Sequence, residues 1–243
     1  KFIKNNNLEG IIQAEEGCYD HNKLKAMLIK KLAQSKIKIF YNFNLNKIKY
    51  QNKVLTLISD KNKLIKSKID VIVNATYDSS NQILKKFFAK KRFSEYLHQL
   101  TEVVTVKTKV PFPGITIMDG PFATIMPLTK KKNKYLLYDV TNSILKTSNK
   151  PIPKNTKKSN YLKIKSKLSK YLHFTKDFKY VSSAYGNRPT PKKDANSDRS
   201  TKIIENNYRK NIKIISIREG KYISAPYVAH KLSKKIINYL NEK

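Results

Sequence analysis

The C-terminal part of the chain has the clearest pattern of hydrophobic and polar positions. Residues Ile212–Ile217 are mostly apolar and β-branched and too few for a helix, so they predict a buried strand. From Pro226, beyond Gly220, an apolar side chain recurs at every fourth position, which is the spacing of an amphipathic helix. These positions are Val228, Leu232, Ile236 and Leu240. A strand, a glycine turn and a helix would place free backbone N–H groups at one point, where an anionic or electron-rich cofactor can bind.

The N-terminal part predicts a helix followed by short strands. Asp20 is a suitable helix cap, and the helix would carry its apolar side chains on one face. These side chains belong to Leu24, Met27, Leu28 and Leu32. Residues Ile37–Tyr41 predict a short strand. A three-stranded meander is expected next, with strands at Lys47–Tyr50, Val54–Ser59 and Leu64–Ser67 and turns at Gln51–Asn52 and Lys61–Asn62.

Residues Asp70–Ala75 form an apolar run suited to a parallel strand buried on both faces. From about Asn81 the pattern changes to a basic helix, with Leu84, Phe87 and Phe88 on it, and then to an antiparallel sheet. Its strands are expected at Val103–Val110, Gly114–Met118, Ala123–Pro127 and Tyr135–Val140.

An exposed loop and a second basic helix follow this sheet. Residues Ser148–Ser159, with two prolines and four lysines, predict the loop. The helix would bury one apolar face and carry lysines elsewhere. That apolar face is formed by Tyr161, Ile164, Leu168 and Tyr171. A basic amphipathic helix can lie on a membrane, but a solvated lysine face above a packed apolar stripe is far more common.

Composition indicates a folded protein with a substantial core. The chain has 243 residues, of which 40% are hydrophobic. Its one cysteine, Cys18, excludes an internal disulfide framework and a metal site built from several cysteines, and we expect no metal. We expect a cytoplasmic protein with no transmembrane segment, because no apolar run reaches the length of a membrane span and no signal-peptide core is present. The first residue is Lys1, so we expect the sequence to begin partway through a longer protein.

The formal net charge of +34 comes almost entirely from lysine. Such a surface attracts any polyanion in a salt-dependent way. Base-specific recognition relies on arginine forks, however, and the chain has only five arginines, with its lysines spread along the whole length. We therefore expect no specific nucleic-acid partner.

Several segments together resemble the D-amino-acid-oxidase-like family of FAD-dependent oxidoreductases. From Gly186 the chain reads Gly-x-Arg-Pro-x-Pro, residues 71–76 read Val-Ile-Val-Asn-Ala-Thr, and the strand, glycine and helix described above close the sequence. The family has a glycine after this Asn-Ala-Thr, whereas this chain has Tyr77. Glycine would let the backbone approach the cofactor, so Tyr77 either shifts that contact or weakens binding. Taken alone, residues 74–80 also suit an ordinary polar strand-to-helix turn.

The resemblance implies an α/β fold with an α+β insertion. A Rossmann-like FAD-binding domain would comprise residues 1–80 and 181–243, interleaved with an antiparallel-sheet substrate domain of residues 81–180. The chain has no Gly-x-Gly-x-x-Gly for the FAD pyrophosphate, so this domain would be incomplete at its N-terminus. A strand–turn–helix unit is expected before Lys1, and without it the chain would bind FAD poorly.

The resemblance also implies the site and the reaction. FAD would be the cofactor, and a small-molecule substrate would be oxidised by hydride transfer to the flavin. The implied cofactor-binding residues are Asn74, Ala75, Thr76, Gly186, Gly220, Lys221, Tyr222 and Ile223. Arg188 would bind the substrate anion because its planar guanidinium can pair both carboxylate oxygens, although a structural salt bridge is an equal alternative. The substrate class stays open among amino acids, hydroxy acids and glycerol phosphate.

A second function is compatible with the same residues. A non-catalytic relative could keep the fold and act as a basic module that binds polyanions or a protein partner. The oligomeric state is not indicated by the sequence.

Overall fold

The structure is a computed structural model in which the chain forms two compact units. It describes residues 3–4, 8–15, 17–89, 93, 96–109, 111–118, 122–128, 133–155, 158–192, 201–218 and 222–243. Unit 1 comprises Lys1–Lys38, Gln99–Ser148 and Ile152–Arg188, and unit 2 comprises Ile39–His98, Asn149–Pro151 and Pro189–Lys243. The sequence predicts domain boundaries at 80/81 and 180/181, with a substrate domain between them and an FAD-binding domain on either side. This division by role stays a prediction.

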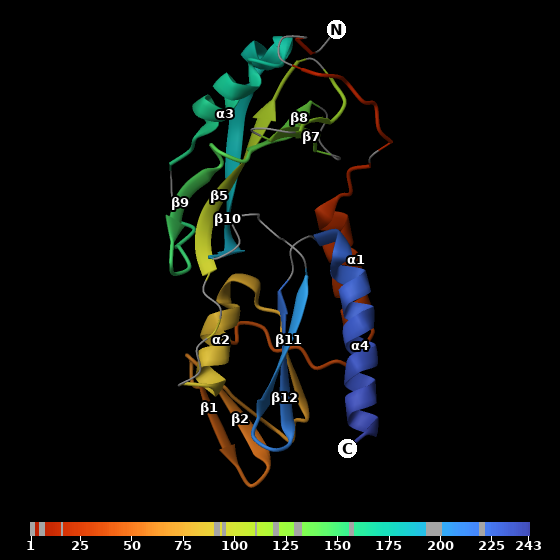
Figure 1. Ribbon diagram of the computed structural model, residues 1–243, viewed down its shortest axis with the longest axis vertical. Helices are drawn as coiled ribbons and strands as arrows, with labels where there is room; N and C mark the ends of the chain where they lie inside the picture. The colour runs from red at the N-terminus through yellow and green to blue at the C-terminus, as the bar shows by residue number, and fades with distance from the viewer. Residues whose placement is uncertain are drawn as a thin grey trace. The chain divides into compact units, whose positions relative to one another are not determined.

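Antiparallel strands form the main sheet (Figure 1), whose order is β10-β5-β8-β7-β6, with β9 pairing to β5. The strands are β5 (Tyr96–Lys107), β6 (Ile115–Ile117), β7 (Ala123–Pro127), β8 (Lys134–Asp139), β9 (Ile144–Ser148) and β10 (Lys179–Pro191). Alternate residues of β5 are buried from His98 to Val106, as the two-residue period of a strand requires. The four strands expected from the sequence are confirmed, whereas β9 and β10 were not predicted.

The core of unit 1 lies between this sheet and the helix α3 (Tyr161–Leu168). Ile164 and Leu168 of α3 are buried with Val104 and Leu137 of the sheet, so the expected apolar face of this helix is confirmed. The segment between β9 and α3 departs from the expected exposed loop at Ile152, which is buried. Asn187 holds Ile152 there, because its side chain bonds both the amide and the carbonyl of that residue.

A buried carboxylate also ties this unit together. Glu102, on β5, is fully buried and accepts hydrogen bonds from Ser159 Oγ at 2.5 Å and from the Asn160 amide at 2.8 Å. The hydroxyl of Ser183, on β10, is a third donor. These donors offset the cost of burying a carboxylate.

The helix α1 (His21–Ala33) differs from its expected packing. Asp20 caps it as predicted, accepting hydrogen bonds from the amides of Asn22 and Lys23. However, α1 has no buried residue, and Met27 and Leu28 of its apolar face are exposed. Helical spacing predicts which side chains share a face, but it does not say whether another element covers that face.

Unit 2 contains the expected meander as a three-stranded antiparallel sheet. Its strands are β1 (Leu45–Gln51), β2 (Val54–Ser59) and β3 (Leu64–Ser67), in the order β1-β2-β3. Asn52 and Asn62 have φ of 50° and 57° and lie in the two expected turns. Asparagine tolerates this left-handed conformation, which explains why the turns could be read from the sequence.

The second sheet of unit 2 carries the candidate cofactor segments. Its order is β11 (Lys202–Tyr208), β12 (Ile212–Arg218) and β4 (Val71–Asn74), and β4 pairs with β12 in parallel. The helix α2 (Ser80–Phe87) follows β4 and contributes Leu84 and Phe87 to the same core as Leu55 and Ile214. The parallel strand is confirmed, but Val73 is 41% exposed, so its expected burial on both faces is wrong.

Two expectations at the edges of unit 2 have different outcomes. The C-terminal helix is confirmed as α4 (Ala225–Asn241), with Val228 and Leu232 buried. The expected strand at Ile37–Tyr41 is wrong, since this segment is not in a sheet and its apolar side chains are largely exposed. A β-branched, apolar run becomes a strand only where a neighbouring strand pairs with its backbone groups.

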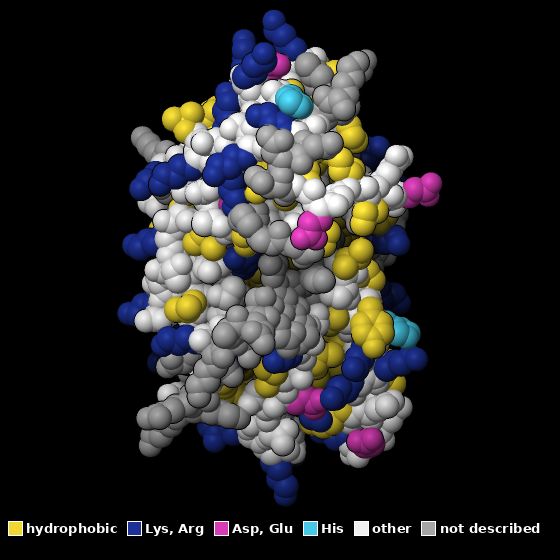
Figure 2. All heavy atoms as spheres, turned by 45° about the horizontal axis from the view of Figure 1, so that its top comes forward, with side chains coloured by type: hydrophobic (Ala, Val, Ile, Leu, Met, Phe, Trp, Pro, Cys, Tyr) yellow, Lys and Arg dark blue, Asp and Glu magenta, His cyan; other side chains and the backbone are white. Residues whose placement is uncertain are grey.

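Basic side chains are widely distributed on the face of the molecule that Figure 2 shows. Lys and Arg side chains are scattered over the face seen in Figure 2 and do not form one continuous patch there. Within the described parts of the chain, no helix has the length and apolar character needed to cross a membrane.

Candidate functional site

The turn after β4 is organised by the side chain of Asn74. Asn74 is 2% exposed, and its Nδ2 donates to the Ser80 carbonyl at 3.0 Å, to Ser80 Oγ at 3.1 Å and to Ser216 Oγ at 3.3 Å. Its Oδ1 accepts a hydrogen bond from Thr76 Oγ1 at 2.6 Å. The donor and acceptor groups of this amide are therefore used inside the protein, and Asn74 positions the turn.

The backbone of this turn has a left-handed residue at Tyr77. Directly after Asn74, Ala75 and Thr76 lead into a short 3-10 helix, Tyr77–Ser79, at the start of α2. Tyr77 has a φ of 51°, in the left-handed region that glycine adopts most easily. A conformation that favours glycine is therefore adopted here by a tyrosine.

The end of β12 lies at the same edge of this sheet as the turn. Ser216 pairs with Asn74 in the parallel register, so the carboxyl ends of both strands are adjacent. The sequence predicts that both cofactor segments follow parallel strands of one sheet, and the parallel pairing of β4 with β12 confirms this. Gly220, Lys221 and the side chain of Tyr222 lie outside the described residues. Ile223 is 86% exposed.

Arg188, on β10 in unit 1, is held by neutral side chains. Its Nε and Nη2 donate to Gln99 Oε1 at 3.0 and 2.6 Å, and its Nη1 donates to the Tyr138 hydroxyl at 3.1 Å. Among the described residues no carboxylate forms an ion pair with it. The structural salt bridge considered above is therefore not formed among the described residues, and the role of Arg188 as an anion contact stays a prediction.

The residues before Arg188 fix the strand that carries it. The Gly186 carbonyl accepts a hydrogen bond from Thr101 Oγ1 at 3.0 Å, and Asn187 is buried against Ile152. Successive side chains of a strand point to opposite faces, so burial of Asn187 directs Arg188 to the other face. A Cβ added at Gly186 would meet no atom within 4 Å, so a steric need for glycine is absent at this position.

Arg218, at the end of β12, is a candidate that sequence reasoning missed. Its guanidinium lies over the ring of Tyr96, with Cζ 4.4 Å from the ring centroid, and burial lowers its pKa. No ion pair joins it to a carboxylate in the part of the chain that the structure describes. Two features of the sequence could have drawn attention to Arg218: it is one of few arginines, and it ends the strand that precedes Gly220.

A buried histidine, His98, lies close to Asp78 in the turn after β4. His98, on β5, is buried, and its Nδ1 has no hydrogen-bond partner among the described residues. Burial lowers its pKa, and the charge of Asp78 in the turn acts in the opposite direction. The described residues contain no group of three or more His, Cys, Asp or Glu side chains that could hold a metal ion.

Comparison with known proteins identifies the fold. No protein-family model and no curated protein matches the sequence. Glycine oxidase from Geobacillus kaustophilus is 15% identical with a TM-score of 0.59, and the match covers 79% of this chain and 47% of that chain. L-proline dehydrogenase from P. horikoshii is 15% identical with a TM-score of 0.58, covering 82% and 50%. Iminodiacetate oxidase from Chelativorans is 10% identical with a TM-score of 0.56, covering 82% and 49%.

The chain is similar in fold to part of each of these three proteins. It spans about half the length of each of these proteins. The resemblance to D-amino-acid-oxidase-like oxidoreductases, inferred above from a few short segments, is confirmed at the level of the fold, which combines α/β structure with antiparallel sheets.

Proposed function

We propose that this chain is part of an FAD-dependent oxidoreductase that oxidises a small amino acid or hydroxy acid at carbon. The observation that carries the proposal is the parallel pairing of β4 with β12. This pairing brings the ends of two strands, far apart in sequence, to one sheet edge. In open α/β sheets, ligands bind at the carboxyl ends of parallel strands. The similar solved structures, among them glycine oxidase and L-proline dehydrogenase, favour an amino-acid substrate.

The residues at the carboxyl ends of β4 and β12 are suited to contact FAD outside its pyrophosphate. The left-handed backbone at Tyr77 and the short turn held by Asn74 suit backbone contacts with a cofactor. We assign these contacts to Ala75 and Thr76, and contacts with the flavin ring to Gly220–Ile223. Bound FAD would supply the hydride acceptor. We assign no residue of this chain to the FAD pyrophosphate, because the given sequence contains no Gly-x-Gly-x-x-Gly.

Arg188 would hold the substrate by its carboxylate. Its three hydrogen bonds to Gln99 and Tyr138 use three of the five guanidinium N–H groups. The two remaining N–H groups are enough for a bidentate contact with a carboxylate. Because Gln99 and Tyr138 are neutral, they orient the guanidinium without cancelling its charge. Arg218, in unit 2, is a separate candidate for contact with an anion, since its charge is half-buried and over an aromatic ring.

The division of roles follows from the same proposal. We assign cofactor binding to residues 1–80 and 181–243, and substrate binding to residues 81–180. Gly186 and Arg188 lie shortly after the substrate-binding part in sequence, at the start of the second cofactor-binding segment. A residue at this position can serve the substrate while its neighbours serve the cofactor.

The test is flavin binding by the protein as its natural gene encodes it. We expect a yellow protein with flavin absorbance, whose colour is bleached anaerobically by a substrate amino acid or hydroxy acid. Tyr77→Gly should bind FAD at least as tightly as the wild type, because glycine lets the backbone approach the cofactor. A colourless protein whose melting temperature does not rise with added FAD would overturn the proposal and favour the non-catalytic relative.

A further inference from the structure

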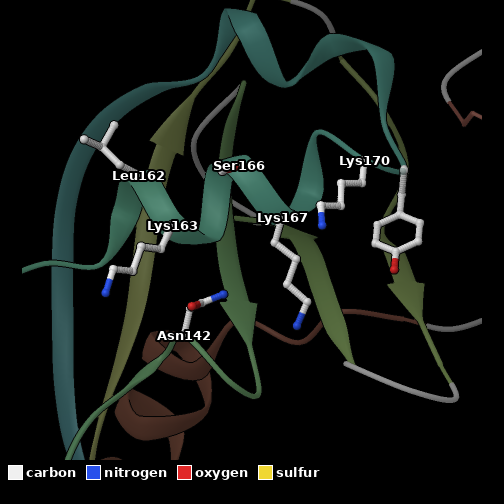
Figure 3. A pocket seen from close by; sticks show the side chains of 7 residues that line it. Asn142, Leu162, Lys163, Ser166, Lys167 and Lys170 are labelled. Atoms are coloured by element: carbon white, nitrogen blue, oxygen red, sulfur yellow. The ribbon is translucent and has the colours of Figure 1, made fainter.

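The outer face of α3 carries a lysine-lined pocket that the oxidoreductase function does not use. The pocket has a volume of about 510 Å³ and lies between α3 and the turn after β8. It is lined by Asn142, Leu162, Lys163, Ser166, Lys167, Lys170 and Tyr171. Figure 3 shows the side chains of Lys163 and Lys167 extending from α3 on the side of Asn142, with Lys170 further along the chain.

The three lysines share one face of the helix because of their spacing. Lys163, Lys167 and Lys170 are four and three residues apart, so they lie one above the other on α3 and its continuation. Like charges at this spacing repel each other. An anion bound between them would remove that repulsion.

A buried carboxylate fixes the central lysine. Lys167 Nζ lies 3.0 Å from Asp139 Oδ2 and 3.1 Å from Oδ1, and Asp139 is fully buried. The amides of Thr141 and Asn142 donate to Oδ1 at 2.7 and 2.9 Å. Burial alone would raise the pKa of Asp139, but these hydrogen bonds and Lys167 together lower it, so the carboxylate is charged. Lys167 is therefore held in place and its charge is balanced.

The outer lysines have no such balance. In the described segments of the chain, neither Lys163 nor Lys170 forms an ion pair with a carboxylate, and both are exposed. The pocket therefore keeps two positive charges after Asp139 has neutralised Lys167. Further donors are the Ser166 hydroxyl and the second Nδ2 hydrogen of Asn142, whose first is given to Asp139 Oδ2 at 3.1 Å.

We propose that this pocket binds the phosphate group of a phosphate monoester. At neutral pH such a group carries between one and two negative charges and three acceptor oxygens, which match the two free ammonium groups and the hydroxyl and amide donors. Leu162, which is 74% exposed, and Tyr171 flank the lysines and would contact the organic part of the ligand. The phosphate can belong to a soluble metabolite or to a lipid headgroup, and the proposal does not depend on flavin binding.

The test uses the full chain with inorganic phosphate as the probe. Titration at low ionic strength should shift the backbone amide resonances of residues 163–171 in a saturable way. The double variant Lys163→Gln/Lys170→Gln should weaken binding at least tenfold. Its matched control is Lys146→Gln/Lys179→Gln, which makes the same charge change at two exposed lysines of unit 1 and should bind like the wild type. All four positions are exposed, so both double variants should fold.

The outcomes separate a built site from general attraction. Equal weakening in both double variants, or amide shifts spread over exposed lysines throughout the chain, would overturn the proposal, since they indicate only diffuse charge. Vesicles containing phosphatidic acid, compared with phosphatidylglycerol vesicles of equal surface charge, identify the source of the phosphate. Selective sedimentation with phosphatidic acid that is lost in Lys163→Gln/Lys170→Gln supports the site with a lipid ligand. Binding of inorganic phosphate without vesicle binding supports it with a soluble one.

Discussion

Asn74 in unit 2 and Arg188 in unit 1 have opposite surroundings, although the sequence predicts a ligand-binding role for both. Asn74 is buried, and its amide is used by Ser80, Ser216 and Thr76. Arg188 is partly buried and is held only by the neutral groups of Gln99 and Tyr138 among the described residues. Two polar residues in predicted ligand-binding motifs can therefore differ: the amide of Asn74 is satisfied within the fold, whereas the guanidinium of Arg188 is oriented by neutral partners.

The difference has a physical basis in what each group costs when it is left unpaired. A buried amide without partners loses its hydrogen bonds to water, so Asn74 must be satisfied within the protein. A partly buried guanidinium keeps contact with solvent and needs only to be oriented. Stability is accordingly expected to depend on Asn74, and ligand affinity on Arg188.

The largest effect is expected for Asn74→Ala. The substitution leaves Ser80 and Ser216 without their shared donor and creates a small cavity, so it should lower the free energy of unfolding by about 3 kcal/mol. Urea denaturation measures this loss. Asn149→Ala, at an exposed asparagine, is the matched control and should change stability by less than about 0.5 kcal/mol. Similar, small losses in both variants would show that the network at Asn74 does not hold the turn.

Arg188→Ala should give the second largest effect, on substrate binding and not on stability. Loss of a charge-assisted pair should weaken binding by about 2 kcal/mol, or roughly 30-fold in half-saturation of flavin reduction. The free energy of unfolding should fall by less than about 1 kcal/mol, because the partners lost are neutral.

Two further variants separate charge from geometry at this site. Arg188→Lys should rescue little, because an ammonium cannot pair both carboxylate oxygens. Gln99→Leu, which removes two of the bonds that orient the guanidinium, should raise half-saturation by less than Arg188→Ala does. Unchanged reduction kinetics in all three variants would assign Arg188 a structural role only.

A smaller effect is expected at Tyr77, beside Asn74. The left-handed backbone costs about 1–2 kcal/mol for a residue with a Cβ, and the greater freedom of glycine in the unfolded chain offsets part of this. Tyr77→Gly should therefore be more stable than Tyr77→Ala by roughly 0.5–1 kcal/mol. Both variants remove the ring, so their difference in urea denaturation reports the backbone alone. An alanine variant as stable as the glycine variant would contradict the left-handed conformation.

The smallest effect is a pH dependence from His98. Its pKa is lowered from 6.5 by burial, so the folded state favours the neutral ring. Its contribution to stability is present above about pH 6.5 and is lost as the pH falls through the lowered folded pKa. His98→Gln should flatten this decline in urea midpoints, whereas His230→Gln, at an exposed histidine, should keep it. An equally steep decline in His98→Gln would assign the pH dependence to other groups.

The sequence alone determined the elements whose signals are local. Each of these signals depends on a few adjacent residues. They are the apolar, β-branched run of β12, the apolar side chain at every fourth position of α4 and the asparagine turns at Asn52 and Asn62. The cap at Asp20 is local in the same sense. Such patterns are independent of where the rest of the chain lies, so the structure confirms them.

Only the tertiary structure decided which surfaces are covered and which polar groups are paired. Asn74 bonds Ser216, which is 142 positions away, and Arg188 bonds Gln99, which is 89 positions away, and no local pattern links either pair. The run Ile37–Tyr41 has the composition of a strand and the apolar stripe of α1 has the spacing of a core helix, yet neither is packed as predicted. Pairing and burial depend on a second element, and the residues of the first element do not encode its presence.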